Sequence, residues 1–166
     1  MNNLTICDMH CDTATKLYDN NINLDLETIA HTQFFAVFLS PEYYKNPQKR
    51  CFDVINYMYN EFLNKSEKIK LCRSFKDLNS KKTNAFLTIE GGEAISSITD
   101  LKTFYDLGIR LLTLTWNNDN HIGGANDSLM GLTDFGKKLI PAMNDIGMIV
   151  DLSHASEKTF FDTCEI

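Results

Sequence analysis

The chain has 166 residues, of which 43% are hydrophobic and 11% aromatic, enough for the core of one domain of ordinary size. Its formal net charge of −6 argues against a nucleic-acid-binding surface, which needs clustered Lys and Arg. No apolar run approaches the roughly 20 residues of a membrane span, and the N-terminus lacks the basic and apolar regions of a secretory signal, so we expect no membrane partner.

Short apolar runs alternate with amphipathic stretches, a pattern typical of βαβ units around a parallel sheet. Five runs are predicted to be strands: 5–12, 34–39, 85–89, 110–116 and 148–152. Apolar residues near helical spacing predict helices over 51–63 and 101–107, and Gly108 is a suitable left-handed C-cap for the second. The stretch 65–82 is expected to be solvated helix and loop.

The next predicted helix is the most clearly delimited one in the chain. Thr133 is expected as its N-cap, Asp134 favours the positive end of the helix dipole, and Gly147 ends it. Ser156 is then expected to cap a helix that begins near Glu157. No Gly, Pro or polar tail ends that helix before Ile166, so we expect the chain to be a portion of a longer one.

About five strand–helix units fall within the chain, and no linker or internal repeat divides them. A (β/α)8 TIM barrel needs roughly 250 residues, so the length predicts about the first five units of such a barrel within a single domain, 1–166. An open doubly wound sheet of five strands also fits the length and is the alternative.

His10-Cys11-Asp12 closes the first predicted strand. Residues i and i+2 of a strand project to the same face, so the imidazole and the carboxylate can meet at one point. Such a pair suits zinc or another first-row metal. The alternative is a buried pair held by a hydrogen bond.

Polar residues also follow the other predicted strands. Glu90 precedes two glycines, the fourth strand continues into 116–120, and the fifth continues into Asp151-Leu152-Ser153-His154. Active sites of both candidate architectures lie at the C-terminal ends of parallel strands, so a convergent site is predicted there. In that site Glu90 could bridge two metals about 3.5–4 Å apart, whereas the alternative is a helix cap beside a tight turn.

The remaining histidines and the cysteines carry weaker signals. His31 is expected at the surface or as a cap, and His121 lies in a Gly- and Asn-rich loop from which it could face the site. Five cysteines without a Cys-x-x-Cys unit predict reduced, mostly buried thiols in a cytoplasmic protein.

Five segments in this order resemble the membrane dipeptidase (renal dipeptidase) family of zinc peptidases, in its bacterial form. They are DMHCDT (8–13), IEGG (89–92), LTLTWN (112–117), GLTDFG (131–136) and IVDLSH (149–154). The resemblance implies a metallo-dependent hydrolase barrel that carries two Zn²⁺ ions and hydrolyses dipeptides. It implies that His10 and Asp12 bind one zinc, that Glu90 bridges both, and that His154 contacts the substrate and stabilises the tetrahedral intermediate. A water or hydroxide held between the metals would be the nucleophile.

The chain departs from the family pattern in two respects. The second zinc of the family needs two histidines from later strands, and a later aspartate and arginine serve catalysis and substrate binding. All four would lie beyond Ile166, so we expect the active site to be incomplete in this chain and the chain to be inactive alone. A Trp that lines the substrate pocket of the animal enzymes is Thr15 here.

Two other readings stay open. The chain could be a non-catalytic remnant or a binding fragment of that barrel, or it could belong to another metal-dependent amidohydrolase such as a deaminase. Deaminases on this barrel usually begin with His-x-His, where this chain has His10-x-Asp12. A homodimer of the complete protein is compatible with the resemblance.

Overall fold

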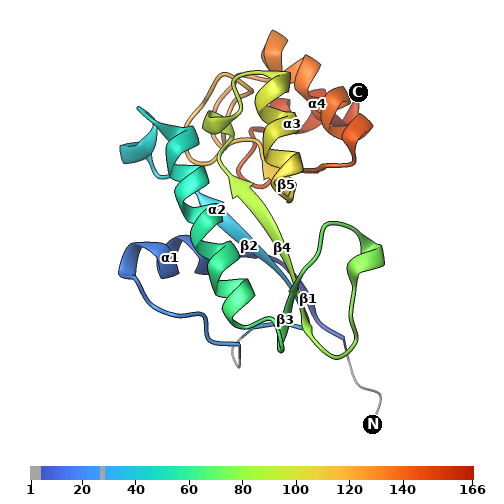
Figure 1. Cartoon of the computed structure of the whole chain (residues 1–166). Helices are drawn as coiled ribbons and strands as arrows, with labels where there is room; N and C mark the ends of the chain where they lie inside the picture. Colours follow the sequence, from blue (N-terminus) through green and yellow to red (C-terminus); the bar gives the residue numbers. More distant parts are fainter. Residues whose placement is uncertain (1–4, 27–28) are drawn as a thin grey trace.

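The computed structural model describes residues 5–26 and 29–166 and shows a curved sheet of parallel strands with helices packed against one side (Figure 1). Within the described residues the strands are β1 (Cys7–Cys11), β2 (Thr32–Phe38), β3 (Ile69–Leu71), β4 (Thr83–Glu90), β5 (Ile109–Thr113) and β6 (Ile149–Asp151). The α-helices are α1 (Thr13–Asn20), α2 (Pro47–Asn64), α3 (Ile98–Asp106), α4 (Asp134–Ile146) and α5 (Glu157–Cys164). Three short 3-10 helices are η1 (Pro41–Tyr43), η2 (Phe75–Asp77) and η3 (Gly92–Ala94).

The strand order separates the two predicted architectures. The sheet runs β1-β2-β4-β5-β6 in chain order, every pair is parallel, and β3 adds only a short pairing to the start of β4. A doubly wound sheet reverses its strand order at a switch point, and this sheet does not. The sheet therefore forms a half-barrel, and the open-sheet alternative is wrong.

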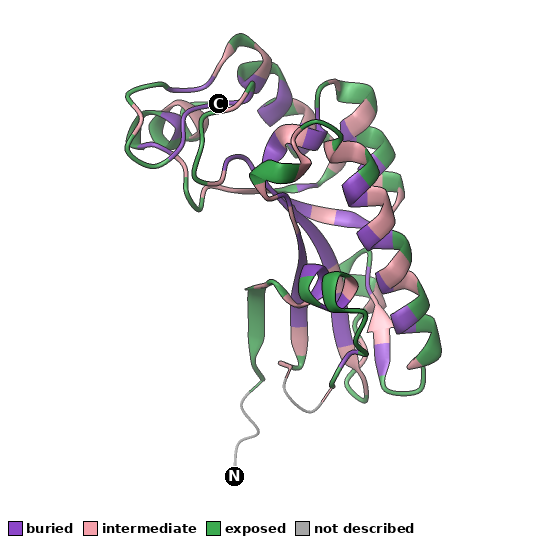
Figure 2. Ribbon diagram, turned by 90° about the vertical axis from the view of Figure 1, so that its left-hand side faces the viewer, coloured by how far each residue is buried: buried purple, intermediate pink, exposed green. Residues whose placement is uncertain are grey.

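Alternation along the strands divides the side chains between two faces. Phe35, Leu87 and Leu112 are fully buried and face the helices, where they join a core that includes Val54 and Met58 of α2. In Figure 2 the helices line one side of the sheet, the central strands are largely buried, and the edge strand β1 is largely exposed. This continuous apolar packing between sheet and helices accounts for most of the driving force for folding.

The opposite face of the sheet is concave and carries its own side chains. Phe34 and Phe86 stack with ring centroids 4.7 Å apart, and they line an open hollow of about 590 Å³ near the beginnings of the strands. Met9 on β1 and Ile149 on β6 lie at the two edges of this hollow and are 44% and 43% exposed. The half-barrel thus presents apolar surface and two unpaired strand edges among its described residues.

Most of the elements predicted from the sequence are present. The side chains of Thr133 and Ser156 accept hydrogen bonds from the third residues of α4 and α5, and Gly147 ends α4 in a left-handed conformation, as predicted. Gly108 likewise takes a positive φ of 98° just after α3. The fourth predicted strand ends earlier than expected, at Thr113, because the Leu114 carbonyl accepts bonds from a neighbouring turn and loop.

Two expectations are wrong. The stretch 65–82 contains β3, whose three residues are too few for a periodic signal, although Ile69 is buried and pairs with Thr83. The cysteines are all unpaired, but they are not mostly buried, since Cys7 and Cys164 are exposed. Within the described parts of the chain, no helix has both the length and the apolar character needed to cross a bilayer.

The open hollow generates a prediction about association. We expect this polypeptide, expressed by itself, to self-associate, because an exposed strand edge beside apolar surface pairs readily with other chains. Met9→Lys and Ile149→Lys should each reduce association by charging one edge, whereas Leu129→Lys should not, because Leu129 is 94% exposed and does not line the hollow. Sedimentation velocity measures the effect. A monodisperse wild-type monomer with cooperative unfolding would contradict the prediction.

Candidate metal centre

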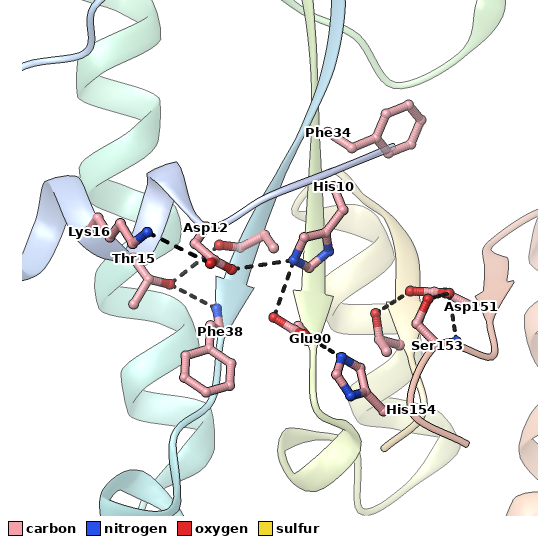
Figure 3. A network of polar contacts seen from close by, with 12 residues as sticks. His10, Asp12, Thr15, Lys16, Phe34, Phe38, Glu90, Asp151, Ser153 and His154 are labelled. Carbon is pink, nitrogen blue, oxygen red and sulfur yellow. Dashed lines mark hydrogen bonds and ion pairs between the residues drawn. The ribbon is translucent and has the colours of Figure 1, made fainter. Parts of the chain in front are cut away.

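A cavity of about 300 Å³ opens at the C-terminal ends of the strands, on the concave face of the sheet. The residues that line it come from five separate segments of the chain: His10, Asp12, Phe38, Glu90, Trp116 and His154. Figure 3 shows Glu90 between the two histidines. Pairing across the sheet explains the convergence, since Phe38 pairs with Glu90, Glu90 with Thr113, and Thr113 with Asp151 in one row.

The first two ligand candidates lie where β1 ends. A register irregularity between Asp8 and Cys11 re-aims the end of the strand, and the Asp8 carboxylate accepts a hydrogen bond from the backbone N–H of His10. His10 Nε2 lies 3.3 Å from Asp12 Oδ1, so the two side chains meet as predicted, although β1 ends at Cys11 and Asp12 is the N-cap residue of α1. Their side chains are 41% and 47% exposed, which excludes the alternative of a buried structural pair.

Glu90 is the last residue of β4, and its side chain is only 6% exposed. Its Oε2 lies 3.5 Å from His10 Nε2, and its Oε1 lies 3.5 Å from His154 Nε2. Gly91 adopts a φ of 97°, and a Cβ on Gly92 would stand 2.6 Å from the Leu114 carbonyl oxygen, so both glycines are needed for the turn. The carboxylate faces the cavity instead of capping the following helix, so the capping alternative is wrong.

The chemistry of this group fits a divalent metal ion. One ligand atom each from His10, Asp12 and Glu90 lies within 4.8 Å of the others. The 3.5 Å contacts of Glu90 exceed the usual 2.7–3.2 Å range of an N–H···O hydrogen bond, which leaves a nearly buried carboxylate weakly paired. An imidazole nitrogen with two carboxylates is a donor set that zinc and other first-row metals accept.

The electrostatic environment of Glu90 also favours a bound cation. Burial raises the pKa of the Glu90 carboxyl group above its ordinary value, and the charges of Asp12 and Asp151 raise it further, while His10 and His154 lower it. Desolvation is the largest of these causes, because a buried carboxylate loses its hydration. A divalent cation at this position would supply the positive charge that the buried carboxylate lacks.

His154 follows β6 and reaches Glu90 from the side opposite His10 (Figure 3). Two aromatic side chains enclose the space beside it: Trp116 lies 4.8 Å from Phe38 and 6.4 Å from His154, between ring centroids. The strand-end pattern indicated Trp116, but Phe38 was missed because only polar strand ends were considered. The signal that could have found Phe38 is its place as the last residue of β2.

Three other residues considered in the sequence lie outside the cavity lining. His121 Nε2 lies 2.7 Å from the Ile95 carbonyl oxygen, and His31 precedes β2 at the opposite end of the sheet, where its Nδ1 accepts from the Ile6 N–H. Thr15 is buried, accepts a 2.8 Å bond from the Phe38 N–H and donates to the Ala36 carbonyl oxygen. It fastens α1 to the end of β2 instead of lining the cavity.

The comparisons with known proteins agree on one family. The sequence model of the membrane dipeptidase family (peptidase family M19) matches residues 1–166. Dipeptidase 3 of Mus musculus is 35% identical over an alignment of 97 positions that covers 53% of this chain and 20% of the mouse protein. The crystal structure of the M19 metallopeptidase named dipeptidase AC superposes with a TM-score of 0.87 at 21% identity, covering 98% of this chain and 60% of that one.

A second solved structure, a metallopeptidase from Rhodobacter sphaeroides, carries a phosphinate mimic of the dipeptide L-Ala-D-Ala. It superposes with a TM-score of 0.86 at 21% identity, covering 98% of this chain and 62% of that one. At this identity the likeness establishes the fold, a partial TIM barrel. The chain spans about 60% of the length of these two structures and a fifth of the mouse protein.

Burial of Glu90 generates a prediction about stability and metal. A carboxyl group with a raised pKa in the folded state stabilises the fold when protonated, and that stability is lost as pH rises from 4.5 through the raised pKa. At pH 7 without metal, Glu90→Gln should therefore raise the melting temperature, by about 2–4 °C for each kcal/mol gained.

Zinc should reverse the order of the two melting temperatures, because it stabilises only the protein that binds it. We expect Zn²⁺ to raise the melting temperature of the wild type and to leave that of Glu90→Gln nearly unchanged. Glu67→Gln, which replaces an exposed carboxylate outside the cavity lining, is the control and should behave as the wild type. Calorimetry in EDTA and in Zn²⁺ measures both effects; a Glu90→Gln protein that is less stable in EDTA would contradict the assignment.

Proposed function

The chain belongs to the membrane dipeptidase family, and from this premise we propose that its barrel hydrolyses the peptide bond of dipeptides with the help of zinc. The observation that carries the proposal is the meeting of His10, Asp12 and Glu90 within 4.8 Å of one another, with His154 across from them. Because the chain spans about 60% of the solved metallopeptidases, the proposal concerns the activity of the complete barrel.

Each ligand has a distinct part in this proposal. His10 and Asp12 would hold one Zn²⁺ ion, and Glu90 would help to hold that ion and a second one in the complete protein. Zinc supplies a Lewis acid for the peptide carbonyl and brings the pKa of water near neutrality. The low exposure of Glu90 supports its part, because a carboxylate in a dry site is paired most effectively by a metal ion.

His154 acts on the substrate in this proposal. Its imidazole is 38% exposed and faces the cavity beside Glu90, so its Nε2 is available to donate to a carbonyl oxygen on which negative charge develops. Phe38 and Trp116 form an aromatic wall next to it, which supports binding of a small ligand with an apolar part.

The remaining parts of the proposal concern the complete protein. The second zinc needs further ligands, and His31 and His121 lie elsewhere in the described structure. The cytoplasmic location and the homodimer stay predictions.

The alternative of a non-catalytic binding fragment has one observation in its favour, the open apolar hollow between β1 and β6. That alternative predicts association with a complementary barrel fragment and no hydrolysis. A deaminase is disfavoured by Asp12, which stands where such enzymes usually carry a second histidine.

The proposal predicts two kinds of variant in the protein expressed from its complete reading frame. His10→Ala and Asp12→Ala should lose bound zinc and dipeptide hydrolysis together. His154→Ala should retain zinc but lower kcat about 10²–10³-fold, the usual effect of removing one donor to a developing oxyanion. Release of free amino acids from a dipeptide panel and zinc content by mass spectrometry measure both effects.

His31→Ala is the matched control, because it removes a histidine at the far end of the sheet and should leave both measurements unchanged. A His10→Ala protein that hydrolyses dipeptides at the wild-type rate would overturn the proposal. Zinc binding by the complete wild type without hydrolysis of any dipeptide would favour the alternative of a non-catalytic binding fragment.

A further inference from the structure

The backbone of His154 is held in an unusual conformation. Its φ is +63°, and among the described non-glycine residues only Asn21 and Asn126 share a positive φ. Asparagine tolerates this region because its short side chain bonds locally, but other L-residues meet a steric penalty between Cβ and the backbone. A residue kept there by its surroundings is a candidate for a positioned functional group.

Three hydrogen bonds fix the chain on the C-terminal side of this residue. The His154 carbonyl oxygen accepts from the Asn126 N–H at 2.7 Å and from Thr115 Oγ1 at 3.2 Å. Two residues later, the Ser156 N–H donates to the Gly124 carbonyl oxygen at 2.9 Å. The loop that follows β5 therefore holds the carbonyl of His154 in place.

The side chain of Asp151 fixes the chain on the N-terminal side. Its Oδ1 accepts from the Ser153 N–H at 3.0 Å and from Ser153 Oγ at 2.7 Å, which closes a tight turn. Its Oδ2 accepts from Thr113 Oγ1 at 2.6 Å, so β5 holds the carboxylate itself. The bonds between Asp151 and Ser153 can be followed in Figure 3. Both oxygens of Asp151 are thus used within the protein.

These contacts determine where the imidazole points. From the left-handed backbone His154 Nε2 reaches 3.5 Å from Glu90 Oε1, and a return to negative φ would swing the ring away from the cavity. The turn that contains His154 is closed by the Ala155 N–H, which donates to the Leu152 carbonyl oxygen at 3.1 Å. We propose that Asp151 is a positioning residue for His154: by holding Ser153 it fixes the first part of this turn, which keeps His154 left-handed and its imidazole over Glu90. This inference rests on the proposed function for its catalytic consequence, but the geometry itself can be tested without activity.

A competing explanation is that Asp151 acts through its negative charge. Asp151→Asn separates the two explanations, because the amide oxygen can still accept both bonds from Ser153. The amide nitrogen can donate to the Thr113 hydroxyl, which is donor and acceptor. Asp151→Ala removes both the charge and the hydrogen bonds.

The first experiment measures the backbone preference at position 154 by thermal unfolding of the full chain. Glycine adopts positive φ without penalty, so His154→Gly should melt about 2–8 °C above His154→Ala. In an Asp151→Ala background this difference should fall to less than half, and in Asp151→Asn it should persist. Ser153→Ala deletes only the 2.7 Å bond from Ser153 Oγ to Asp151, so it should reduce the Gly–Ala difference in melting temperature in part. This variant replaces Asp151→Ala in the experiment if Asp151→Ala does not fold.

A purely structural role of Asp151 would lower every melting temperature but leave the Gly–Ala difference unchanged. An unchanged difference in the Asp151→Ala background, or in Ser153→Ala where that variant replaces it, would therefore overturn the inference. The same measurement on Asp145→Ala, an exposed carboxylate on α4, is the control and should leave the difference intact.

The second experiment measures kinetics of the zinc-loaded complete protein. Asp151→Ala should lower kcat about 10–100-fold with KM and zinc content retained, and Asp151→Asn should retain most of kcat. Equal losses in Asp151→Ala and Asp151→Asn would show a role of charge and overturn the inference, as would loss of zinc in parallel with activity. A wild type that hydrolyses no dipeptide would overturn the proposed function, while the melting experiment would still decide the role of Asp151.

Discussion

Parallel pairing of β1, β2, β4, β5 and β6 in chain order is the constraint on which the rest of the structure depends. Because every strand points the same way, the carboxyl ends of all five lie along one edge of the sheet. Residues as distant in the chain as His10 and His154 thereby come within 3.5 Å of the same carboxylate. An open sheet with a reversal of strand order would have split these ends into two groups around a switch point.

The same pairing organises the concave face into rows. Phe34 pairs with Phe86 in an apolar row, and the next row joins Ala36, Thr88, Leu111 and Ile149. The last row joins Phe38, Glu90, Thr113 and Asp151. Polarity thus rises toward the carboxyl ends, so the buried carboxylate of Glu90 lies at the mouth, where histidines and a metal ion can approach it, and not deep in the apolar interior.

Sequence reasoning recovered the features that depend on local chemistry. The caps at Thr133 and Ser156 were predictable because a hydroxyl there satisfies free N–H groups of the helix, and the polar strand ends were predictable because parallel strands share an edge. The short strand β3 was not predictable, since three residues give no period and its stability depends on pairing with β4. The left-handed backbone of His154 also gave no signal, because it depends not only on the local turn but also on hydrogen bonds between its carbonyl oxygen and residues 28 and 39 positions earlier.

Two residues of the cavity are locally unfavourable, and the architecture explains why the fold tolerates them. Glu90 is a desolvated carboxylate, and His154 has a strained backbone. Ile89 precedes Glu90 on β4, and Leu112 lies on the neighbouring strand β5. Both side chains point to the helix side and are fully buried in the core. Since one face of each strand supplies the packing energy and the other carries the polar residues, unfavourable groups can lie on the concave face and just beyond the strand ends without loss of the core. Locally unfavourable residues therefore lie at the carboxyl ends of the strands, where the core does not depend on them. The candidate metal centre lies at the same place.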